Sequence, residues 1–428
     1  MGGGLMQLVA HGAQDVYLTG DPQITYFKVV YRRHTNFSME SIQQQFQNDA
    51  APGTKTSCLV SRNGDLVGPM YLQFKLNPTW MDSTTAPADR NLGFVSYLKS
   101  VEIEIGGQKI DKHFGRWLDI WDDLTTDANK DEGLSAMLGN KDSAKWATAA
   151  DPAYTFVPLQ FWFNRNIGLA LPLIALQYHE VKINFDFDTT GGTEIWTEVG
   201  LWIDYIFLDT DERKRFAQLS HEYLIDQIQQ HSGSEGEDFG SGDATRFELN
   251  FNHPVKELVW VCENSAAITG SGNTNTTLDV NDGAGNVTPS NIANGNLDAA
   301  DTRQICLNNV KLQINGHDRF YPRHGDYFRL QQPYQFHSTV PPAKDIYCYS
   351  FALRPEEHQP SGTANFSRID SCHLTLTRGT RLTTGDIATP AEIVTPAAGQ
   401  LCDKLFLYAI NYNVLRIASG MAGLAYSN

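Results

Sequence analysis

The clearest pattern along this 428-residue chain is a short alternation of apolar and polar side chains. Residues 101–105 read VEIEI, and a Gly-Gly pair follows at 106–107. Successive side chains of a strand point to opposite faces, so Val101, Ile103 and Ile105 would share one face. A glycine pair after such a run is typical of a tight hairpin turn. The segment therefore predicts a half-buried strand that runs into a hairpin.

The same pattern occurs again in the second half of the chain. Residues 310–323 (VKLQINGHDRFYPR) match residues 101–114 (VEIEIGGQKIDKHF), with apolar side chains at alternate positions and an Asn-Gly pair at the turn. Three further pairs of segments match in the same order: 36–45 with 222–231, 173–185 with 366–378, and 201–209 with 405–413. Ordered self-similarity of this kind indicates a duplicated unit of about 200 residues.

The spacing between matched segments changes only where the connections differ. The second half gains a Gly/Asn/Thr-rich stretch at 264–296, which predicts a long exposed loop, and another connection at 385–399. The first half is longer at 115–146, where short helices between strands are predicted. A constant β framework with variable connections follows.

Each half has about eight short strands, which predicts a two-sheet β-sandwich, and the jelly roll is the sandwich with that number of strands. A propeller would need a shorter and more frequent repeat. The predicted fold class is all-β, with two tandem eight-stranded sandwiches and short inserted helices. Periodicity alone leaves the order of the strands open.

The charge of the chain argues against direct binding to nucleic acid. The formal net charge is -16, and it divides evenly: residues 1–215 hold 19 basic and 27 acidic side chains, and residues 216–428 hold 14 and 22. Binding to phosphates needs clustered Lys and Arg. We therefore expect no direct nucleic-acid binding.

Cysteines and the amino terminus bear on the compartment. The six cysteines are spread singly with no C-x-x-C pair, which favours reduced, mostly buried thiols. The start MGGGLM has neither a basic region nor the long apolar run of a signal peptide. The most apolar stretch, 167–176, is about half the length that spans a bilayer and contains Pro172. We expect a soluble protein made without a secretory signal.

The sequence contains near-matches to catalytic motifs, but each lacks a residue that the motif requires. His221-Glu222 opens like the metalloprotease H-E-x-x-H, but Ile225 stands where the second histidine is needed. The close carboxylates Asp209, Asp211 and Glu212 read as a charged strand-to-turn exit rather than an acid/base pair. We expect no catalytic, cofactor-binding or metal site. A cupin-like metalloenzyme and a secreted lectin stay as alternatives from other classes.

Four N-x-[ST] sequons occur in the chain. Asn36 and Asn365 lie beside strand-like segments, where coincidence is the better interpretation. Asn275 and Asn286 lie in the long polar stretch, where a sugar would be accessible. They are the candidate glycosylation residues.

Long segments over the whole chain carry a family resemblance. These segments are 3–37 (GGLMQLVAHGAQDVYLTGDPQITYFKVVYRRHTNF), 168–182 (GLALPLIALQYHEVK), 202–225 (WIDYIFLDTDERKRFAQLSHEYLI), 250–256 (NFNHPVK), 359–370 (QPSGTANFSRID) and 412–426 (YNVLRIASGMAGLAY). They resemble the major capsid proteins of nucleocytoplasmic large DNA viruses, and most of all those of the chlorella-virus-like phycodnaviruses. Loops at 77–96, 115–155, 264–300 and 379–400 carry no such likeness.

The resemblance implies a double jelly roll in a structural virion protein. It divides the chain into an amino-terminal arm (1–35), a first jelly roll (36–215) and a second jelly roll with the carboxyl-terminal tail (216–428). It implies a homotrimer that forms a pseudo-hexagonal capsomer of an icosahedral shell, assembled in the host cytoplasm. A minor capsid or penton protein is a further alternative, although those commonly carry one jelly roll.

The resemblance also implies which partners the protein has. Expected partners are neighbouring capsomers, minor capsid and penton proteins, and indirectly an inner membrane layer. We expect the arm and the tail 416–428 to lie on the inner side of the shell or to bridge neighbours, and the loop 264–296 to lie on its outer face.

Overall fold

The computed structural model describes residues 2–77, 93–139, 154–188, 195–231, 236–239, 244–263, 307–341, 345–378 and 404–426. The chain folds into two compact units, Met1–Phe37 and Ser38–Asn428. The first unit contains two short helices, α1 (Gly3–Val9) and α2 (Val16–Thr19), neither of which buries a residue. The larger unit contains both sandwiches, so the predicted boundary at 215/216 stays a prediction. The predicted boundary at 35/36 stays a prediction as well.

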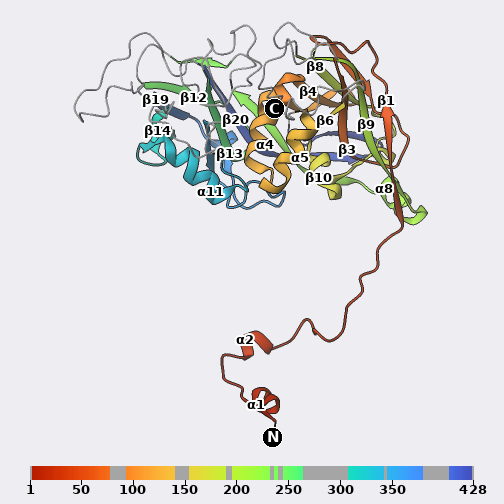
Figure 1. The fold of residues 1–428 in the computed structure, drawn as a ribbon, viewed down its shortest axis with the longest axis vertical. Helices are drawn as coiled ribbons and strands as arrows, with labels where there is room; N and C mark the ends of the chain where they lie inside the picture. The colour runs from red at the N-terminus through yellow and green to blue at the C-terminus, as the bar shows by residue number, and fades with distance from the viewer. Residues whose placement is uncertain are drawn as a thin grey trace, which may run out of the picture. The chain divides into compact units, whose positions relative to one another are not determined.

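The first sandwich has two antiparallel sheets (Figure 1). One has the strand order β1-β9-β3-β6, and the other has the order β2-β8-β4-β5. The strands are β1 (Phe37–Gln44), β2 (Lys55–Leu59), β3 (Leu66–Leu76), β4 (Leu98–Ile105), β5 (Gln108–Phe114), β6 (Tyr154–Pro158), β8 (Val181–Phe187) and β9 (Trp196–Leu208), with the short β7 (Leu171–Pro172) beside β3.

The second sandwich repeats this arrangement, with orders β10-β20-β13-β17 and β12-β19-β14-β15. Its strands are β10 (His221–His231), β12 (Ala244–Glu248), β13 (Pro254–Glu263), β14 (Leu307–Ile314), β15 (His317–Asp318), β17 (Ile346–Ser350), β19 (Cys372–Arg378) and β20 (Lys404–Ala418). Short strands at the margins are β11 (Glu237–Asp238), β16 (Arg323–His324), β18 (Ala364–Asn365) and β21 (Met421–Leu424).

Both sandwiches have the jelly-roll strand order. When the eight principal strands are counted along the chain, one sheet joins the first, eighth, third and sixth, and the other joins the second, seventh, fourth and fifth. The four pairs of repeated segments fall on equivalent strands: β1 and β10, β4 and β14, β8 and β19, β9 and β20. The predicted pair of eight-stranded sandwiches is confirmed, and the structure supplies the strand order that periodicity left open.

The two matched hairpins have the turn that their sequences predict. Gly106 and Gly107 have φ of 59° and 83°, and Asn315 and Gly316 have φ of 48° and 80°. Two successive residues with positive φ favour Gly and Asn and give a turn whose twist suits the flanking strands. This local requirement explains why Gly-Gly and Asn-Gly recur at the same place in both halves.

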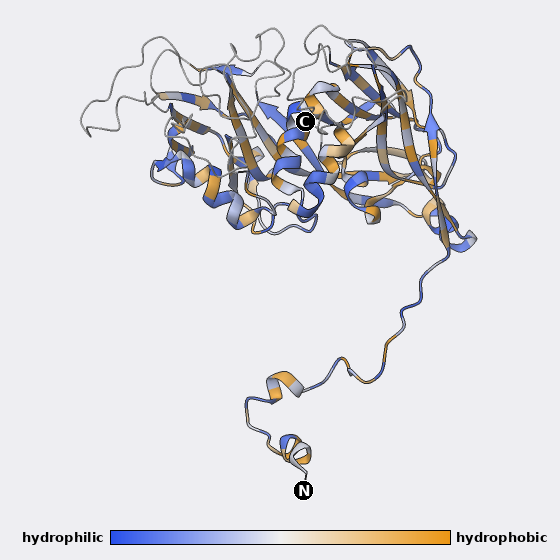
Figure 2. Ribbon diagram, viewed as in Figure 1, coloured by the Kyte–Doolittle hydropathy of each residue, from blue (hydrophilic) through white to orange (hydrophobic). Residues whose placement is uncertain are grey.

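Alternation along the strands builds the cores (Figure 2). In β8, Val181, Ile183, Phe185 and Phe187 are buried, while the residues between them are partly exposed. Each sheet face that points inward is apolar for this reason. Four described cysteines, Cys58, Cys262, Cys348 and Cys372, are buried and form no disulfide with one another, as predicted, while Cys306 and Cys402 lie outside the described residues.

Helices occupy the connection between the fifth and sixth strands in both sandwiches. In the first, α4 (Gly115–Thr125) and α5 (Ala128–Leu138) confirm the helices predicted within 115–146. In the second, the π-helical η5 (Tyr327–Gln331) leads into α11 (Gln332–Phe336). The other short helical segments are α7 (Trp162–Arg165), η1 (Phe94–Ser96), η2 (Ile167–Leu169), η3 (Leu173–Ala175) and η6 (Phe366–Arg368).

The charged segment after β9 requires a correction. It is not a turn: it starts helix α8 (Thr210–Gln218), which leads towards the second sandwich. The Asp209 carboxylate caps this helix by accepting a hydrogen bond of 2.8 Å from the Thr210 N–H. Asp211 and Glu212 lie in its first turn, where the helix dipole favours negative charge. These carboxylates therefore begin a helix, and the acid/base reading stays rejected.

Candidate functional surfaces

The sheet β10-β20-β13-β17 is buried on both faces. In β20, Leu405 and Leu407 point into the core of their own sandwich, while Phe406 and Tyr408 belong to the apolar cluster of the first sandwich. A strand covered on both sides is apolar almost continuously, which is what the sequence LFLYAI shows. The outer face of this sheet is therefore the joint between the two sandwiches.

Helix α4 covers this outer face and lies between the sandwiches in Figure 1. The Trp117 ring, 2% exposed, lies 5.2 Å from the Tyr408 ring, and the Arg116 guanidinium lies 3.8 Å above the Phe406 ring. Buried aromatic pairs and cation–π contacts of this kind contribute on the order of 1 kcal/mol each beyond area burial. The helix thus holds the second sandwich against the first.

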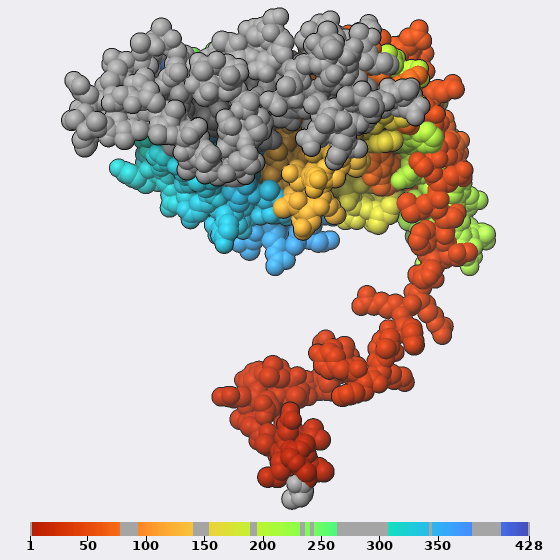
Figure 3. All heavy atoms as spheres, in the orientation of Figure 1, coloured from red at the N-terminus to blue at the C-terminus, as the bar shows by residue number. Residues whose placement is uncertain are grey.

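The segment after α11 also reaches α4. The Thr339 N–H donates to the Leu124 carbonyl at 3.1 Å, and the Thr339 hydroxyl donates to the Thr126 carbonyl at 2.6 Å. In the space-filling view, α4 and α5 (orange) lie directly beside the segment around α11 (cyan) (Figure 3). The inserted helices of both sandwiches therefore take part in one joint.

A bulge in β13 turns two charged residues towards the joint. The register of β13 against β20 shifts between Val255 and Glu257, so Lys256 is the extra residue. A bulge lets two successive side chains leave one face of a sheet. Accordingly, Val255 and Leu258 point into the core of the second sandwich, while Lys256 and Glu257 are fully buried on the other side.

Lys256 belongs to an ion network that joins the sandwiches. Its ammonium lies 3.0 Å from Asp226 Oδ2 on β10, and the same oxygen lies 3.2 Å from Arg165 Nη2 on α7 of the first sandwich. Burial lowers the pKa of Lys256, and the Asp226 carboxylate opposes that shift. The buried ammonium is therefore compensated by one carboxylate that a second cation shares.

Glu257 belongs to a second buried network. The imidazole of His337 lies between two carboxylates, with Nε2 at 2.6 Å from Glu257 Oε1 and Nδ1 at 3.0 Å from Glu356 Oε1. Burial acts to lower the pKa of His337, but Glu257 and the hydrogen bonds around the ring raise it well above the usual value. Each ring nitrogen therefore faces a carboxylate, and this arrangement favours the protonated form of the imidazole.

Further hydrogen bonds, from backbone and side-chain donors, connect the second sandwich to the first. The Ile228 N–H donates to Asp111 Oδ1 at 3.1 Å, and the Gln227 side chain donates to the Ile110 carbonyl. At the carboxyl end, the Ala422 N–H in β21 donates to His179 Nδ1 at 3.1 Å. The described part of the tail thus pairs with β20 and lies against its own chain. A bridge from it to neighbouring chains stays a prediction.

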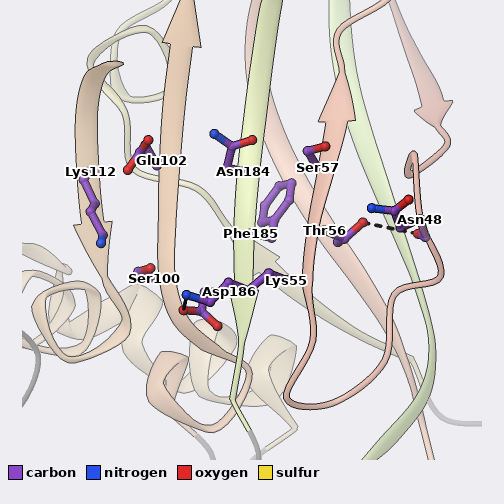
Figure 4. A pocket seen from close by; sticks show the side chains of 10 residues that line it. All are labelled: Asn48, Lys55, Thr56, Ser57, Ser100, Glu102, Lys112, Asn184, Phe185 and Asp186. Carbon is purple, nitrogen blue, oxygen red and sulfur yellow. Dashed lines mark hydrogen bonds and ion pairs between the residues drawn. The ribbon is translucent and has the colours of Figure 1, made fainter. Parts of the chain in front are cut away.

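A polar hollow of about 350 Å³ lies on the outer face of the sheet β2-β8-β4-β5 (Figure 4). Lys55 and Asp186 form an ion pair of 3.2 Å there. Lys112 lines its edge, and burial, followed by repulsion from Lys109, lowers the pKa of Lys112. Charged and hydroxyl side chains cover this face, which is suited to contact with water or a polar partner.

The outer face of the sheet β1-β9-β3-β6 has a different character. On the edge strand β6, Tyr154 and Phe156 are 46% and 39% exposed. Next to them, the Trp202 indole N–H donates to Gln73 Oε1 at 2.5 Å, and Lys75 pairs with Glu198. Aromatic side chains and charges are therefore mixed on a face whose described residues are partly exposed.

A second uncovered apolar surface lies on the inserted helices of the second sandwich. Tyr327, Leu330 and Tyr334 line a hollow of about 570 Å³ on the surface of η5 and α11. The Tyr334 side chain is 82% exposed. Tyr327 and Leu330 are half-buried, so the surface consists of one exposed aromatic ring beside partly exposed apolar side chains, which is typical of a contact site.

The amino-terminal unit also exposes a run of large apolar side chains. They include Leu8, Tyr17, Leu18, Tyr26, Phe27 and Tyr31, with exposed fractions from 73% to 99%. The unit builds no core of its own, so burying these groups requires contact with something else.

The sequence-predicted site residues and the residues found in the joint differ. Asn275 and Asn286 lie outside the described residues. The sequence reasoning missed Lys256, Glu257 and His337. A signal was present, since Lys256-Glu257 interrupts the otherwise apolar strand PVKELVWVC, and charged residues are rarely buried unless they are paired. Among the described residues, no helix has the length and apolarity needed to cross a bilayer.

Two jelly rolls of the same strand order, joined through a sheet that is buried on both faces, define a double jelly-roll protein. Two family models match the chain: "Major capsid protein N-terminus" over residues 25–209 and "Large eukaryotic DNA virus major capsid protein" over residues 212–423. The chain belongs to the major capsid protein family of large eukaryotic DNA viruses, which confirms the resemblance found in the sequence.

Relatives support the same assignment over the full length. The chain is 46% identical to the major capsid protein of Pyramimonas orientalis virus and 44% identical to that of Paramecium bursaria Chlorella virus 1, with 100% of each chain covered. Its structure is similar to the chain in a quasi-atomic model of the PBCV-1 virus capsid, with a TM-score of 0.76, 38% identity and coverage of 94% and 100%. The faustovirus major capsid protein, 13% identical, has the same fold with a TM-score of 0.64.

The family membership settles the class of function. These relatives are structural capsid proteins, so the chain is a structural protein of the virion and not an enzyme. The alternatives of a cupin-like metalloenzyme and a secreted lectin are thereby removed.

Proposed function

We propose that three copies of this chain form a pseudo-hexagonal capsomer, and that such capsomers tile the facets of an icosahedral shell. The observation that carries the proposal is the repeated strand order of the two sandwiches within one chain. A hexagonal lattice needs six similar edges, and three chains with two similar sandwiches each provide them.

The joint within the chain suggests how the copies meet. The inserted helix α4 of the first sandwich lies against the outer face of the sheet β10-β20-β13-β17. Among the described residues, two equivalent surfaces are partly exposed: the inserted η5–α11 segment and the outer face of β1-β9-β3-β6. If η5–α11 of one copy lies against that face of the next copy, the joint is repeated between chains. A head-to-tail contact of this kind gives a ring if its rotation closes.

The side chains of the uncovered surfaces fit this role. In the repeat, Trp202 stands at the position of Phe406, which lies under Arg116 of α4. Tyr154 and Phe156 lie on the same uncovered face as Trp202, and Tyr334 is exposed on α11. Aromatic residues are enriched at the centre of protein interfaces. Contacts within an obligate trimer are expected to bury more than about 2,000 Å².

The test is the mass of the purified native protein, measured by light scattering and native mass spectrometry. We expect a particle near three times the 47.7 kDa chain mass. Phe156→Asp and Tyr334→Asp place a charge on one side each of the proposed contact and should yield folded monomers. Ser57→Asp on the polar face of β2 is the matched control and should leave the trimer intact.

One result would overturn the capsomer, and another would overturn the contact proposed within it. A wild-type chain that stays a monomer at high concentration would remove the capsomer. A trimer that tolerates both Phe156→Asp and Tyr334→Asp would keep the capsomer but reject the contact assigned to these faces. Circular dichroism of each variant separates loss of assembly from loss of folding.

The finer partners are part of the same proposal. Neighbouring capsomers, minor capsid proteins and penton proteins would contact the trimer, with an inner membrane layer reached indirectly and the genome not contacted. The large exposed apolar side chains of the amino-terminal arm support a role for the arm in such contacts. Assembly would take place in the host cytoplasm. Sugars at Asn275 and Asn286 would add mass in hexose-sized steps, which intact-chain mass spectrometry detects.

A further inference from the structure

Three unlike donor groups converge in the joint beneath α11. A carboxylate oxygen of Glu257, a ring nitrogen of His337 and the sulfur of Cys348 lie within 4.8 Å of one another, and all three residues are buried. They come from β13, from the segment after α11 and from β17. Cys348 is directly opposite Val259, so Glu257 is its diagonal neighbour on the same face of the sheet.

We propose that this cluster is a zinc site, in which Cys348 Sγ, His337 Nε2 and the Glu257 carboxylate bind Zn²⁺. The sequence predicted no metal site, because its three ligands are separated by 80 and 11 residues and match no local motif. A set of thiolate, imidazole and carboxylate is a donor combination that zinc uses in proteins.

The first supporting observation is a carboxylate oxygen without a partner. Glu257 is fully buried, and its Oε2 makes no hydrogen bond of ordinary geometry with the described residues; the Cys348 thiol, itself a proposed ligand, lies close to this carboxylate. A buried polar atom left in this way is unfavourable and calls for an explanation. A bound cation would satisfy it, because a carboxylate that binds through both oxygens supplies the fourth donor of a four-coordinate site.

The second supporting observation is the carboxylate that contacts the other ring nitrogen of His337. Glu356 Oε1 lies 3.0 Å from His337 Nδ1. Glu356 is itself fixed, since its Oε1 accepts a hydrogen bond of 2.7 Å from the Ser338 N–H and its Oε2 accepts one from the Ser338 hydroxyl. A histidine that binds zinc almost always donates its other N–H to such a carboxylate. Glu356 thus orients Nε2 towards Glu257 and Cys348.

The exchange of protons for zinc balances. One proton leaves the Cys348 thiol and one leaves the His337 ring, and one Zn²⁺ replaces them, so the net charge of the cluster does not change. Zinc bonds of about 2.0–2.2 Å place nitrogen and oxygen ligands roughly 3.3 Å apart. The Nε2–Oε1 distance is 2.6 Å, so the Glu257 carboxylate has to move by less than about 1 Å to admit the ion.

The place of the site gives it a structural role. The ligands tie the η5–α11 region to the sheet that forms the joint, and Thr339, two residues beyond His337, is hydrogen-bonded to α4. Zinc bound during folding would therefore fix the second sandwich to the first. Structural zinc contributes directly to folding stability.

The test measures metal on the full-length native protein expressed with zinc in the medium. We expect about one zinc per chain by inductively coupled plasma mass spectrometry, and cobalt substitution should give the intense near-ultraviolet absorption of a thiolate ligand. Cys348→Ser should lose the metal. Cys372→Ser, which alters another buried thiol of the same sandwich, should keep it.

His337→Gln serves as a second ligand variant in case Cys348→Ser fails to fold. A strong chelator should lower the Tm of the wild type and of Cys372→Ser, and leave the Tm of a folded ligand variant unchanged. Folded wild-type protein that holds no zinc after refolding in its presence would overturn the proposal, and so would equal zinc in wild type and Cys348→Ser. In either case the cluster would be a hydrogen-bonded network only.

Discussion

The buried ion network at the joint can be tested by removing its carboxylate. Asp226→Leu leaves Lys256, which is fully buried, without the carboxylate at 3.0 Å. Arg165, the other partner of Asp226, is 21% exposed and can turn towards water. The penalty therefore falls mainly on the ammonium of Lys256.

The magnitude follows from what an unpaired buried charge costs. Breaking a buried pair by removing one partner destabilises a protein by about 3–5 kcal/mol, whereas replacing both partners with apolar groups is often close to neutral. For a sandwich of this size, 1 kcal/mol changes Tm by roughly 2–4 °C. We expect Asp226→Leu to lower Tm by about 6–20 °C. The double variant Asp226→Leu, Lys256→Met should recover most of that loss.

The assay is thermal unfolding followed by calorimetry and tryptophan fluorescence. All variants are compared at one protein concentration, because assembly makes Tm depend on concentration. Glu222→Gln is the matched control: it removes the charge of another carboxylate on β10, which pairs with Arg416 on β20. The side chains of Arg416 and Glu222 are 61% and 58% exposed, so this variant should leave Tm nearly unchanged. Equal losses in the single and double variants would refute the reasoning, because the charge on Lys256 would then not matter.

Three further outcomes are expected. Deleting residues 270–290 should leave folding and trimer mass unchanged, since polar loops tolerate truncation, and a monomeric or insoluble product would contradict this. Trp117→Ala should cost about 3–5 kcal/mol in thermal unfolding, because it empties the contact with Tyr408, and a wild-type Tm would contradict it. Stability should fall as the pH rises above about 9. Burial raises the pKa of Cys58 to about 11 and of Cys372 to about 12, so the folded chain keeps protons that the unfolded chain releases. Urea titrations at pH 8 and 10 check it, and an equal midpoint at both would count against it.

The sandwiches could be predicted from the sequence because their signals are local. Alternation with a period of two sets which side chains of β4 and β14 are buried, and positive φ at Gly107 and Gly316 sets their turns. Because the unit is duplicated, the matched segment in the other half supported the prediction of the strand a second time. Strand order was out of reach, since pairing of β1 with β9 joins residues that are more than 150 positions apart.

The networks at the joint could not be predicted for a related reason. Lys256 and Asp226 are 30 residues apart, and Glu257 and His337 are 80 apart, so no local pattern pairs them. The bulge that turns Lys256 and Glu257 to the same side also changes the alternation on which the prediction of burial rests. Interrupting charges in PVKELVWVC could signal an unusual strand, but only the fold identifies their partners.

The two copies of the same sheet have diverged in a way that the proposed trimer explains. In β10-β20-β13-β17 the outer face is covered within the chain as soon as it folds, and it carries Val259, Phe406 and Tyr408. In β1-β9-β3-β6 the equivalent face carries Lys75 and Glu198 beside its aromatic groups.

A surface that is exposed before assembly has to stay soluble, because large apolar patches on a free chain promote aggregation. A surface covered within its own chain faces no such requirement. Its large apolar side chains, such as Phe406 and Tyr408, are buried as soon as the chain folds, and its charged residues Lys256 and Glu257 are buried with partners. The mixture of charges and aromatic side chains on β1-β9-β3-β6 is therefore what we expect of a face that meets its partner only when a second copy arrives.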